Sequence, residues 1–172
     1  MWHRRRVLDM AALFACLGAP IVVADTPARP LGTLNTIAPD FTRTDLSGRP
    51  LQLNRFRGRV VLLNFWATWC GPCVTEIPVF SRWQHRYGGA GLQVIGVSMD
   101  DDEALVKRFV AKHAVSYPVL MGDAKLGESF GGVFGLPQSL LLDAYGRIVF
   151  RQVGEPNMEA LQSQIEGLIR VR

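Results

Sequence analysis

The sequence predicts an α/β domain in which helices cover a mixed central sheet. Two near-continuous apolar runs of strand length, residues 60–66 and 92–99, are each followed by a helical pattern, as expected for strands buried on both faces. Residues 138–143 and 147–154 predict two strands around a tight turn, and residues 157–170 predict an amphipathic closing helix. Strands and helices therefore alternate before a hairpin and a last helix, which indicates one mixed-sheet domain.

The first 24 residues have the layout of a secretory signal peptide. A basic start, MWHRRRV, precedes an apolar run of 15 residues, and small residues stand just before Asp25. A membrane span needs roughly 20 apolar residues. An uncleaved anchor and lipidation at Cys16 remain alternatives. We therefore expect a protein of the periplasm or the outer face of the membrane, soluble after cleavage or N-terminally anchored.

Export changes the charge and the cysteine count of this 172-residue chain. Removal of residues 1–24 deletes three arginines and one aspartate, so the net charge falls from +4 to +2. The basic cluster at residues 55–59 has no interleaved aromatic residues, which argues against nucleic-acid binding. Without Cys16, only Cys70 and Cys73 remain, which excludes a scaffold built on several disulfides.

The segment before the buried strands predicts a linker and a hairpin. Residues 25–37 are polar, carry proline and glycine, and show no period, so we expect a linker ahead of a single domain over residues 38–172. Residues 40–44 and 50–53 flank the short turn at 45–49 and predict a β-hairpin.

The segments after the first buried strand predict helices of different lengths. A helix should run from about residue 70 to residue 87. Asp100, with Glu103 three residues later, predicts a capping box for a helix over residues 101–113. Two minor pieces follow, an irregular or short extended segment at 117–123 and a brief helix at 124–130.

Cys70 and Cys73 could form half a metal site, a structural staple or a redox pair. A disulfide across so short a loop restricts the unfolded chain little. Zinc needs four ligands, and only His85 and His113, in segments expected to be helical, could supply the others. Two thiols could also hold copper(I). A redox pair explains more of the neighbouring residues.

The helix that we expect after the first buried strand favours redox chemistry. If it starts at Cys70, that sulfur lies at the positive end of the helix macrodipole beside free backbone N–H groups, and both favour the thiolate. Cys73, one turn later, would be more covered and placed to resolve a mixed disulfide. Gly71 and Pro72 bring no polar donor, so the thiolate is only modestly stabilised. The pair is therefore expected to give electrons.

Two neighbours of the pair are further candidates. Glu76 lies three residues beyond Cys73, on the same side of the helix. A helical glutamate is usually solvated, but Cys73 needs a group that removes its proton, and the preceding strand offers only Asn64, which cannot. Trp69 is either a core aromatic or an apolar rim for a docking polypeptide.

The stretch NFWATWCGPCVTEIP, with the later GVSMDD and GLPQSLLLDAYGRIVFRQVG, resembles the exported thioredoxin-like reductases typified by TlpA, ResA and DsbE. The similarity covers about residues 38–168. It implies a thioredoxin fold with a mixed central sheet, an N-terminal β-hairpin extension and an inserted helix, for which residues 101–113 are the candidate. The cytochrome-specific branch often has other residues between the cysteines and GAPE at the proline. GLPQ here favours a general TlpA-like reductase.

The resemblance also implies a role for each site residue. Cys70 would be the attacking thiol and Cys73 the resolving thiol. Pro137 matches the family's cis-proline, which packs against the pair and offers a backbone edge to the substrate, and Glu76 matches a buried glutamate. The predicted site comprises catalytic Cys70, Cys73 and Glu76 and substrate-binding Trp69, Gly71, Pro72, Leu136 and Pro137, without a metal or a cofactor other than the disulfide.

Within this family the usual function is to keep thiols reduced in an oxidising compartment. The implied clients are exported proteins such as apocytochrome c or copper-site proteins, and the implied electron donor is a membrane thiol-transfer protein. We expect a monomer. The rivals are an exported disulfide oxidase or isomerase, a copper(I)- or client-binding module, and a thiol peroxidase, although a peroxidase needs a threonine where Ala67 stands.

Overall fold

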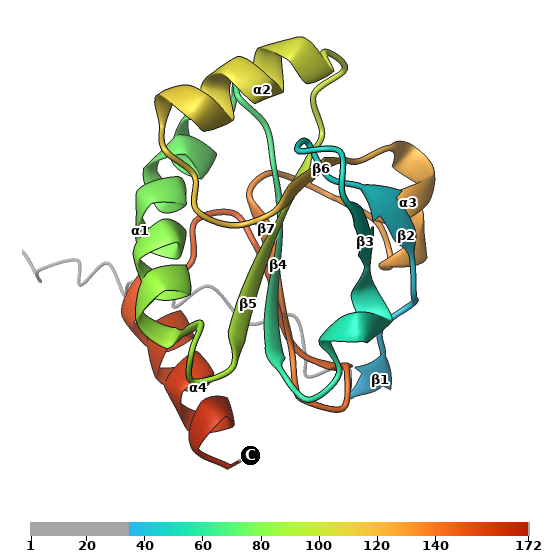
Figure 1. Cartoon of the computed structure of the whole chain (residues 1–172). Coiled ribbons are helices and arrows are strands. Elements are labelled where there is room, and N and C mark those ends of the chain that lie inside the picture. The colour runs from blue at the N-terminus through green and yellow to red at the C-terminus, as the bar shows by residue number, and fades with distance from the viewer. Residues whose placement is uncertain (1–34, 172) are drawn as a thin grey trace, which may run out of the picture.

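The computed structural model describes residues 35–171 as one α/β domain (Figure 1). The predicted signal peptide and most of the predicted linker lie outside the described residues. The described part contains a sheet in the order β1-β8-β7-β4-β5-β6. Its strands are β1 (Thr36–Ile37), β4 (Val60–Trp66), β5 (Leu92–Ser98), β6 (Val119–Met121), β7 (Gln138–Leu142) and β8 (Arg147–Val153).

The sheet is mixed, as the sequence predicts. β5 runs parallel to β4 and β6, whereas β7 is antiparallel to both β4 and β8. Parallel neighbours need a crossover connection, and α1 (Gly71–Tyr87) and α2 (Glu103–Lys112) supply the two crossovers. The tight turn between β7 and β8 joins the antiparallel pair. The carboxyl ends of β4 and β5 therefore lie at one edge, where α1 begins and α2 lies (Figure 1).

Helices and a hairpin cover the two faces of the sheet. α1 and α4 (Met158–Arg170) pack on one face, and α3 (Ala124–Ser129) lies on the other face with the hairpin of β2 (Thr42–Thr44) and β3 (Pro50–Gln52) (Figure 1). β4 shows why both faces are apolar. Its even-numbered apolar residues join the core beneath α1, and its odd-numbered residues join the core beneath the hairpin.

The start of α1 follows the predicted pattern. Cys70 is the N-cap residue, and Pro72 lies in the first turn, where its missing N–H is not needed. Asn64 on β4 pairs with Gly96 on β5. β4 ends shortly before α1 begins, and the side chain of Asn64 lies on the face of the sheet that α1 covers.

The capping box predicted at Asp100 is wrong. α2 begins at Glu103, and the side chain of Asp102 caps it by accepting hydrogen bonds from the N–H groups of Ala104 (2.8 Å) and Leu105 (3.1 Å). Asp100 is buried and accepts hydrogen bonds elsewhere, so its carboxylate is not available to the helix.

The structure corrects the end of the predicted linker and confirms a short extended piece near residue 120. Thr36–Ile37 forms β1 on the edge of β8, so the predicted linker ends earlier than residue 37. The segment expected to be irregular or briefly extended contains β6, which Asp45 bridges from the hairpin turn. Within residues 35–171, the helices lack the length and apolar character of a membrane-crossing segment.

Candidate active site

Cys70 and Cys73 form a disulfide at the start of α1. The Sγ atom of Cys70 accepts a hydrogen bond from the N–H of Cys73 at 3.3 Å. Free N–H groups in a first helical turn favour negative charge, so in the reduced protein this contact favours a thiolate on Cys70. Gly71 and Pro72 span the pair, and Gly71 leaves open space around its Cα.

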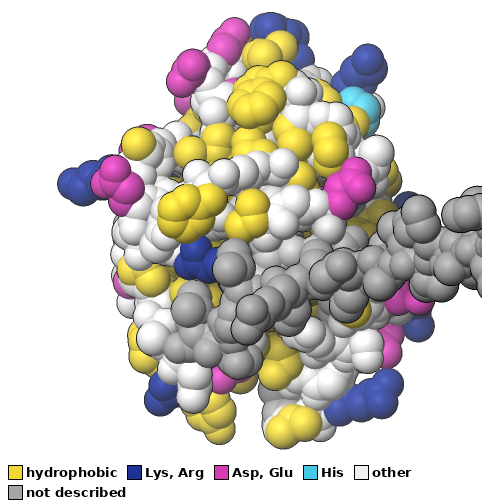
Figure 2. Space-filling view, turned by 180° about the vertical axis from the view of Figure 1, so that it is seen from behind, with side chains coloured by type: hydrophobic (Ala, Val, Ile, Leu, Met, Phe, Trp, Pro, Cys, Tyr) yellow, Lys and Arg dark blue, Asp and Glu magenta, His cyan; other side chains and the backbone are white. Residues whose placement is uncertain are grey.

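The two cysteines differ in exposure. Cys70 is 7% exposed and Cys73 only 1%. Trp69, immediately before the pair, is 71% exposed. The structure therefore places Trp69 on the surface beside the cysteines and excludes the core alternative. Hydrophobic side chains gather on the upper half of the molecule in Figure 2, the end at which α1 begins in Figure 1.

A buried aspartate holds the segment that leads to the pair. Asp100 accepts hydrogen bonds from the N–H of Thr68 at 2.9 Å, from its hydroxyl at 2.6 Å, and from the hydroxyl of Ser98 at 2.7 Å. These contacts tie the loop before Trp69 to the end of β5. The sequence pattern predicts a helix cap at Asp100 and gives no sign of this role, because its partner Thr68 lies 32 residues away.

Glu76 is a buried acid behind the cysteines. It is 4% exposed, and its Oε2 accepts a long hydrogen bond (3.4 Å) from the amide of Asn64, which also donates to Ser139 at 3.1 Å. Burial raises the pKa of Glu76 from 4.5 to about 8, with a contribution from the charge of Glu155 and against the effect of the Asn64 hydrogen bond. The group can therefore exchange a proton near neutral pH, as a general acid-base must.

The peptide bond between Leu136 and Pro137 is cis, as the resemblance implies. Pro137 is buried directly before β7. Because Gln138 pairs with Phe65, Pro137 lies beside the end of β4, on the edge of the sheet that carries the cysteines. Leu136 is partly buried and packs against the core cluster that contains both cysteines.

A clamp that the sequence analysis missed holds the loop before Pro137. The buried guanidinium of Arg151 donates to the carbonyl of Phe130 and, at 3.5 Å, to that of Gly132. The amide of Gln138 donates to the same Gly132 carbonyl at 3.0 Å. The loop presents Phe134, which is 77% exposed. The glycine-rich sequence marks the loop, but nothing local in it marks Arg151.

Two histidines that could have completed a zinc site do not join the pair. His113 stacks on Phe109 at 4.1 Å and follows α2, and His85 lies in the last turn of α1. Residues 35–171 contain no group of three or more histidine, cysteine or acidic side chains placed to hold a metal ion.

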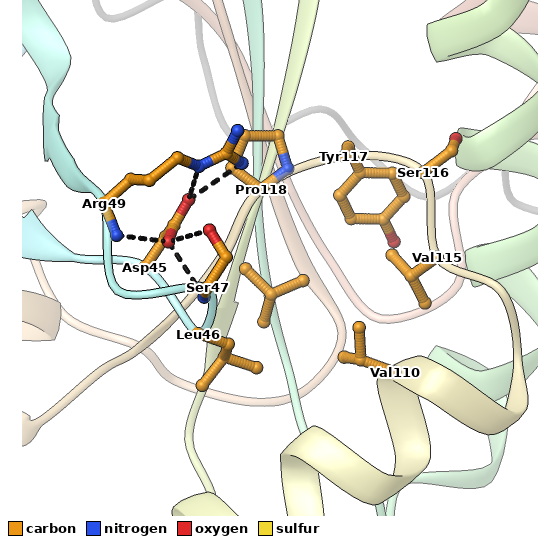
Figure 3. Close-up of a pocket in the computed structure, with 10 residues that line it drawn as sticks. Asp45, Leu46, Ser47, Arg49, Val110, Val115, Ser116, Tyr117 and Pro118 are labelled. Carbon is orange, nitrogen blue, oxygen red and sulfur yellow. Dashed lines mark hydrogen bonds and ion pairs between the residues drawn. The ribbon is translucent and has the colours of Figure 1, made fainter.

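The pocket drawn in Figure 3 is separate from the cysteine pair. It has a volume of about 280 Å³ and lies between the hairpin turn, the end of α2 and the start of β6. None of its lining residues is a predicted site residue. The exposed, apolar side chain of Trp69 beside the cysteine pair lies outside this pocket.

Comparisons with known proteins agree with this geometry. Residues 33–169 match the redoxin family. The chain is 34% identical over 131 residues to the thiol-disulfide oxidoreductase ResA of Bacillus anthracis, and 36% identical over 133 residues to ResA of Bacillus cereus (strain ATCC 10987 / NRS 248), in each case covering 76% of both chains.

Solved structures show the same fold. A thiol:disulfide interchange protein of the thioredoxin family from Chlorobium tepidum is similar at a TM-score of 0.73 and 28% identity, covering 78% of this chain and 97% of that one. A secreted thiol-disulfide isomerase from Corynebacterium glutamicum is similar at a TM-score of 0.72 and 25% identity, covering 77% and 85%. The chain therefore belongs to the redoxin family, has a thioredoxin-like fold, and is a thiol-disulfide oxidoreductase of the ResA and DsbE type with Cys70 and Cys73 as its pair.

Proposed function

We propose that this oxidoreductase reduces disulfides in other exported proteins through a mixed disulfide on Cys70. The observation that carries the proposal is the asymmetry of the pair. Cys70 is the more exposed sulfur and lies at the helix start beside an exposed tryptophan, whereas Cys73 is covered and lies one turn from a buried acid. A client can therefore reach Cys70 first, and Cys73 is left to release it.

The reaction consists of two exchange steps. The Cys70 thiolate attacks one sulfur of the client disulfide, so a bond forms between Cys70 and that sulfur and the client's other sulfur leaves as a thiolate. Cys73 then loses its proton to the Glu76 carboxylate and attacks Sγ of Cys70. The Cys70–Cys73 disulfide forms, the bond between Cys70 and the client breaks, and the client sulfur that was bound to Cys70 leaves as a thiolate. Two electrons pass from the pair to the client.

Glu76 suits the second step because of its raised pKa. The pKa of Glu76 is about 8, so its carboxyl gains and loses a proton near neutral pH and can accept one from Cys73. The same carboxyl can return a proton when the pair is reduced again.

The direction of electron flow rests on the residues between the cysteines. Gly71 and Pro72 offer no side-chain donor to the Cys70 thiolate, so the reduced form gains little stability beyond that provided by the helix start. A weakly stabilised thiolate favours a reducing pair. A reductant outside the cytoplasm needs resupply, and a membrane thiol-transfer protein is the proposed donor.

The proposed clients are exported proteins whose cysteines must be kept as thiols, such as apocytochrome c before haem attachment or copper-site proteins. The Gly71-Pro72 dipeptide and the GLPQ sequence at Pro137 favour a general reductase over one dedicated to cytochromes. The open surface around Trp69 and Phe134 supports a polypeptide client.

A Cys73→Ser trap tests the proposal. The full chain carrying this substitution should accumulate mixed disulfides through Cys70, and mass spectrometry of the adducts names the clients. The matched control is Cys70→Ser, and both variants are made in a Cys16→Ser background. This control then leaves only the covered sulfur of Cys73 and should capture almost nothing. If neither variant captures protein, or if Cys70→Ser captures more, the proposed order of attack is wrong.

A second candidate is a disulfide isomerase, because one similar solved structure is named a secreted thiol-disulfide isomerase. An isomerase rearranges the disulfides of a scrambled protein without net electron transfer. Activity on scrambled ribonuclease in the absence of a reductant supply would favour it, whereas consumption of reductant during reduction of insulin favours the reductase.

A further inference from the structure

Phe134 combines an exposed side chain with a firmly held backbone. It lies on the loop between α3 and β7, three residues before Pro137, and is 77% exposed. A single exposed apolar side chain is normal in a folded protein and needs no explanation on its own. The loop around Phe134 is different, because buried side chains hold its backbone. Such a pre-positioned apolar group suits contact with a partner, since little conformational entropy remains to be lost on binding.

Gln138 holds the backbone of the loop at two points. It is the first residue of β7, and its side chain is fully buried. Its Oε1 accepts a hydrogen bond from the N–H of Phe134 at 3.4 Å, and its Nε2 donates to the carbonyl of Gly132 at 3.0 Å. Arg151 donates to the same carbonyl at 3.5 Å. One side chain thus joins the loop to the strand that begins directly after Pro137.

The ring of Phe134 lies against the backbone of Gly132. A methyl group added at Gly132 would lie 2.8 Å from Cζ of Phe134 and 3.2 Å from both Cε atoms, closer than the 3.5–4.0 Å at which carbon atoms pack. The φ angle of Gly132 is +93°, a conformation that glycine adopts readily. Glycine at this position therefore lets the ring rest on the loop while most of the ring faces solvent.

The loop lies beside the cysteine pair. The antiparallel register of β7 and β4 places Pro137 beside the end of β4, and Cys70 follows that strand end by four residues. Leu136 packs against the core cluster that contains both cysteines. Three residues of chain span at most about 11 Å, so Phe134 lies close to Pro137.

We propose that Phe134 is a specificity-determining residue, which favours client polypeptides that carry an apolar residue two or three positions from the reacting cysteine. The inference rests on the proposed function and names the substrate class of the same site. During exchange the client sulfur is bonded to Sγ of Cys70, so the client residues on either side of it cross the neighbouring surface. An extended chain advances about 3.3 Å per residue, so two or three residues cover about the span from Pro137 to Phe134.

An apolar client residue gains more from this contact than a polar one. Contact with the ring removes apolar surface from water, which is favourable for leucine and not for serine. Because the ring already rests on Gly132, the contact orders few additional groups. Gln138 is a positioning residue in this account, since it acts on the client only through the backbone of Phe134.

Single-turnover reduction of two peptide disulfides tests the proposal. Each substrate consists of two identical peptides joined through their one cysteine, with either leucine or serine at the second and third positions on both sides of it. The reduced full chain, carrying Cys16→Ser, converts each substrate to two peptide thiols while Cys70 and Cys73 form a disulfide. The unaltered site should reduce the leucine peptide about three to ten times faster at limiting concentration. Phe134→Ser should lower this preference at least threefold, with unchanged rates for the serine peptide and for cystine.

Two further variants separate this contact from general effects. Tyr145→Ser is the matched control, because Tyr145 is 76% exposed and lies in the turn between β7 and β8, at the opposite end of β7 from Pro137. It should keep the full preference. Gln138→Met removes both hydrogen bonds to the loop and keeps Phe134. It should lower the preference by raising the half-saturating concentration of the leucine peptide, with the saturated rate and the cystine rate unchanged.

The possible failures are distinguishable. Equal rates for the leucine and serine peptides at the unaltered site, or an undiminished preference in Phe134→Ser, overturn the inference and leave the proposed function intact. If Gln138→Met slows all three substrates equally, the positioning role of Gln138 is wrong. Negligible rates with both peptides and with cystine would contradict the proposed function, and the inference with it.

Discussion

Replacing Glu76 by glutamine should remove a pH-dependent loss of stability from the oxidised protein. The folded state holds the Glu76 proton up to about pH 8, whereas the unfolded state releases it near pH 4.5. Between these values the folded state binds one proton more, so the free energy of unfolding falls by about 1.4 kcal/mol per pH unit as the pH rises. The pKa shift amounts to about 5 kcal/mol in total.

Urea unfolding of the two proteins between about pH 5 and pH 9 measures this difference. Both proteins carry the substitution Cys16→Ser, so that no free thiol can attack the Cys70–Cys73 disulfide in the unfolded chain. Relative to the unaltered protein, Glu76→Gln should gain stability steadily up to about pH 8 and then level off. Glu166→Gln is the control, because hydrogen bonds from Tyr87 and Gln162 lower the pKa of Glu166 and place its titration below this range. Parallel stability curves for Glu76→Gln and the unaltered protein would refute the assignment of a raised pKa.

Four further substitutions test the contacts that hold the site in place and the conformation of the backbone. Asp100→Ala leaves three hydrogen bonds without an acceptor and should lower the free energy of unfolding by about 2–4 kcal/mol in urea unfolding. Arg151→Met should raise KM several-fold for a protein client while leaving the rate with a small disulfide unchanged, because it loosens the loop before Pro137; equal effects on both substrates would contradict this. Gly58→Ala should destabilise the folded protein by about 1 kcal/mol, because φ at Gly58 is +83° although nothing lies near the added methyl group. Gly167→Ala, inside α4 with open space around it, should instead stabilise the folded protein by about 0.5–1 kcal/mol. Thermal unfolding in which both substitutions change the stability in the same direction would contradict this explanation.

The elements nearest the cysteines could be predicted because their signals are local. The apolar run of β4 is buried at every position, and α1 ends at Tyr87, just before the glycines that break the chain. Cys70 and Pro72 occupy the helix start that the sequence indicates. The conformation of these residues follows from local sequence signals, so it could be predicted without knowledge of distant contacts.

The residues that hold the site in place through hydrogen bonds could not be predicted, because their partners are distant in the chain. Asp100 fits a capping consensus, yet burial beside Thr68 determines its partners. Arg151 bonds to carbonyls about 20 residues earlier, and carbonyls carry no sequence signal. The burial of Glu76 was suggested by the chemistry that Cys73 needs and by the family resemblance, not by the helical pattern, which is also compatible with a solvated glutamate.

The reduction potential of the Cys70–Cys73 pair tests the central claim most directly. Equilibration of the full chain with glutathione or with thioredoxin, followed by quantification of the two redox forms, gives the value. We expect a potential close to that of thioredoxin, about −270 mV, because Gly71 and Pro72 add no donor to the thiolate. A potential near that of the oxidant DsbA, about −120 mV, would contradict the claim that the pair reduces its clients.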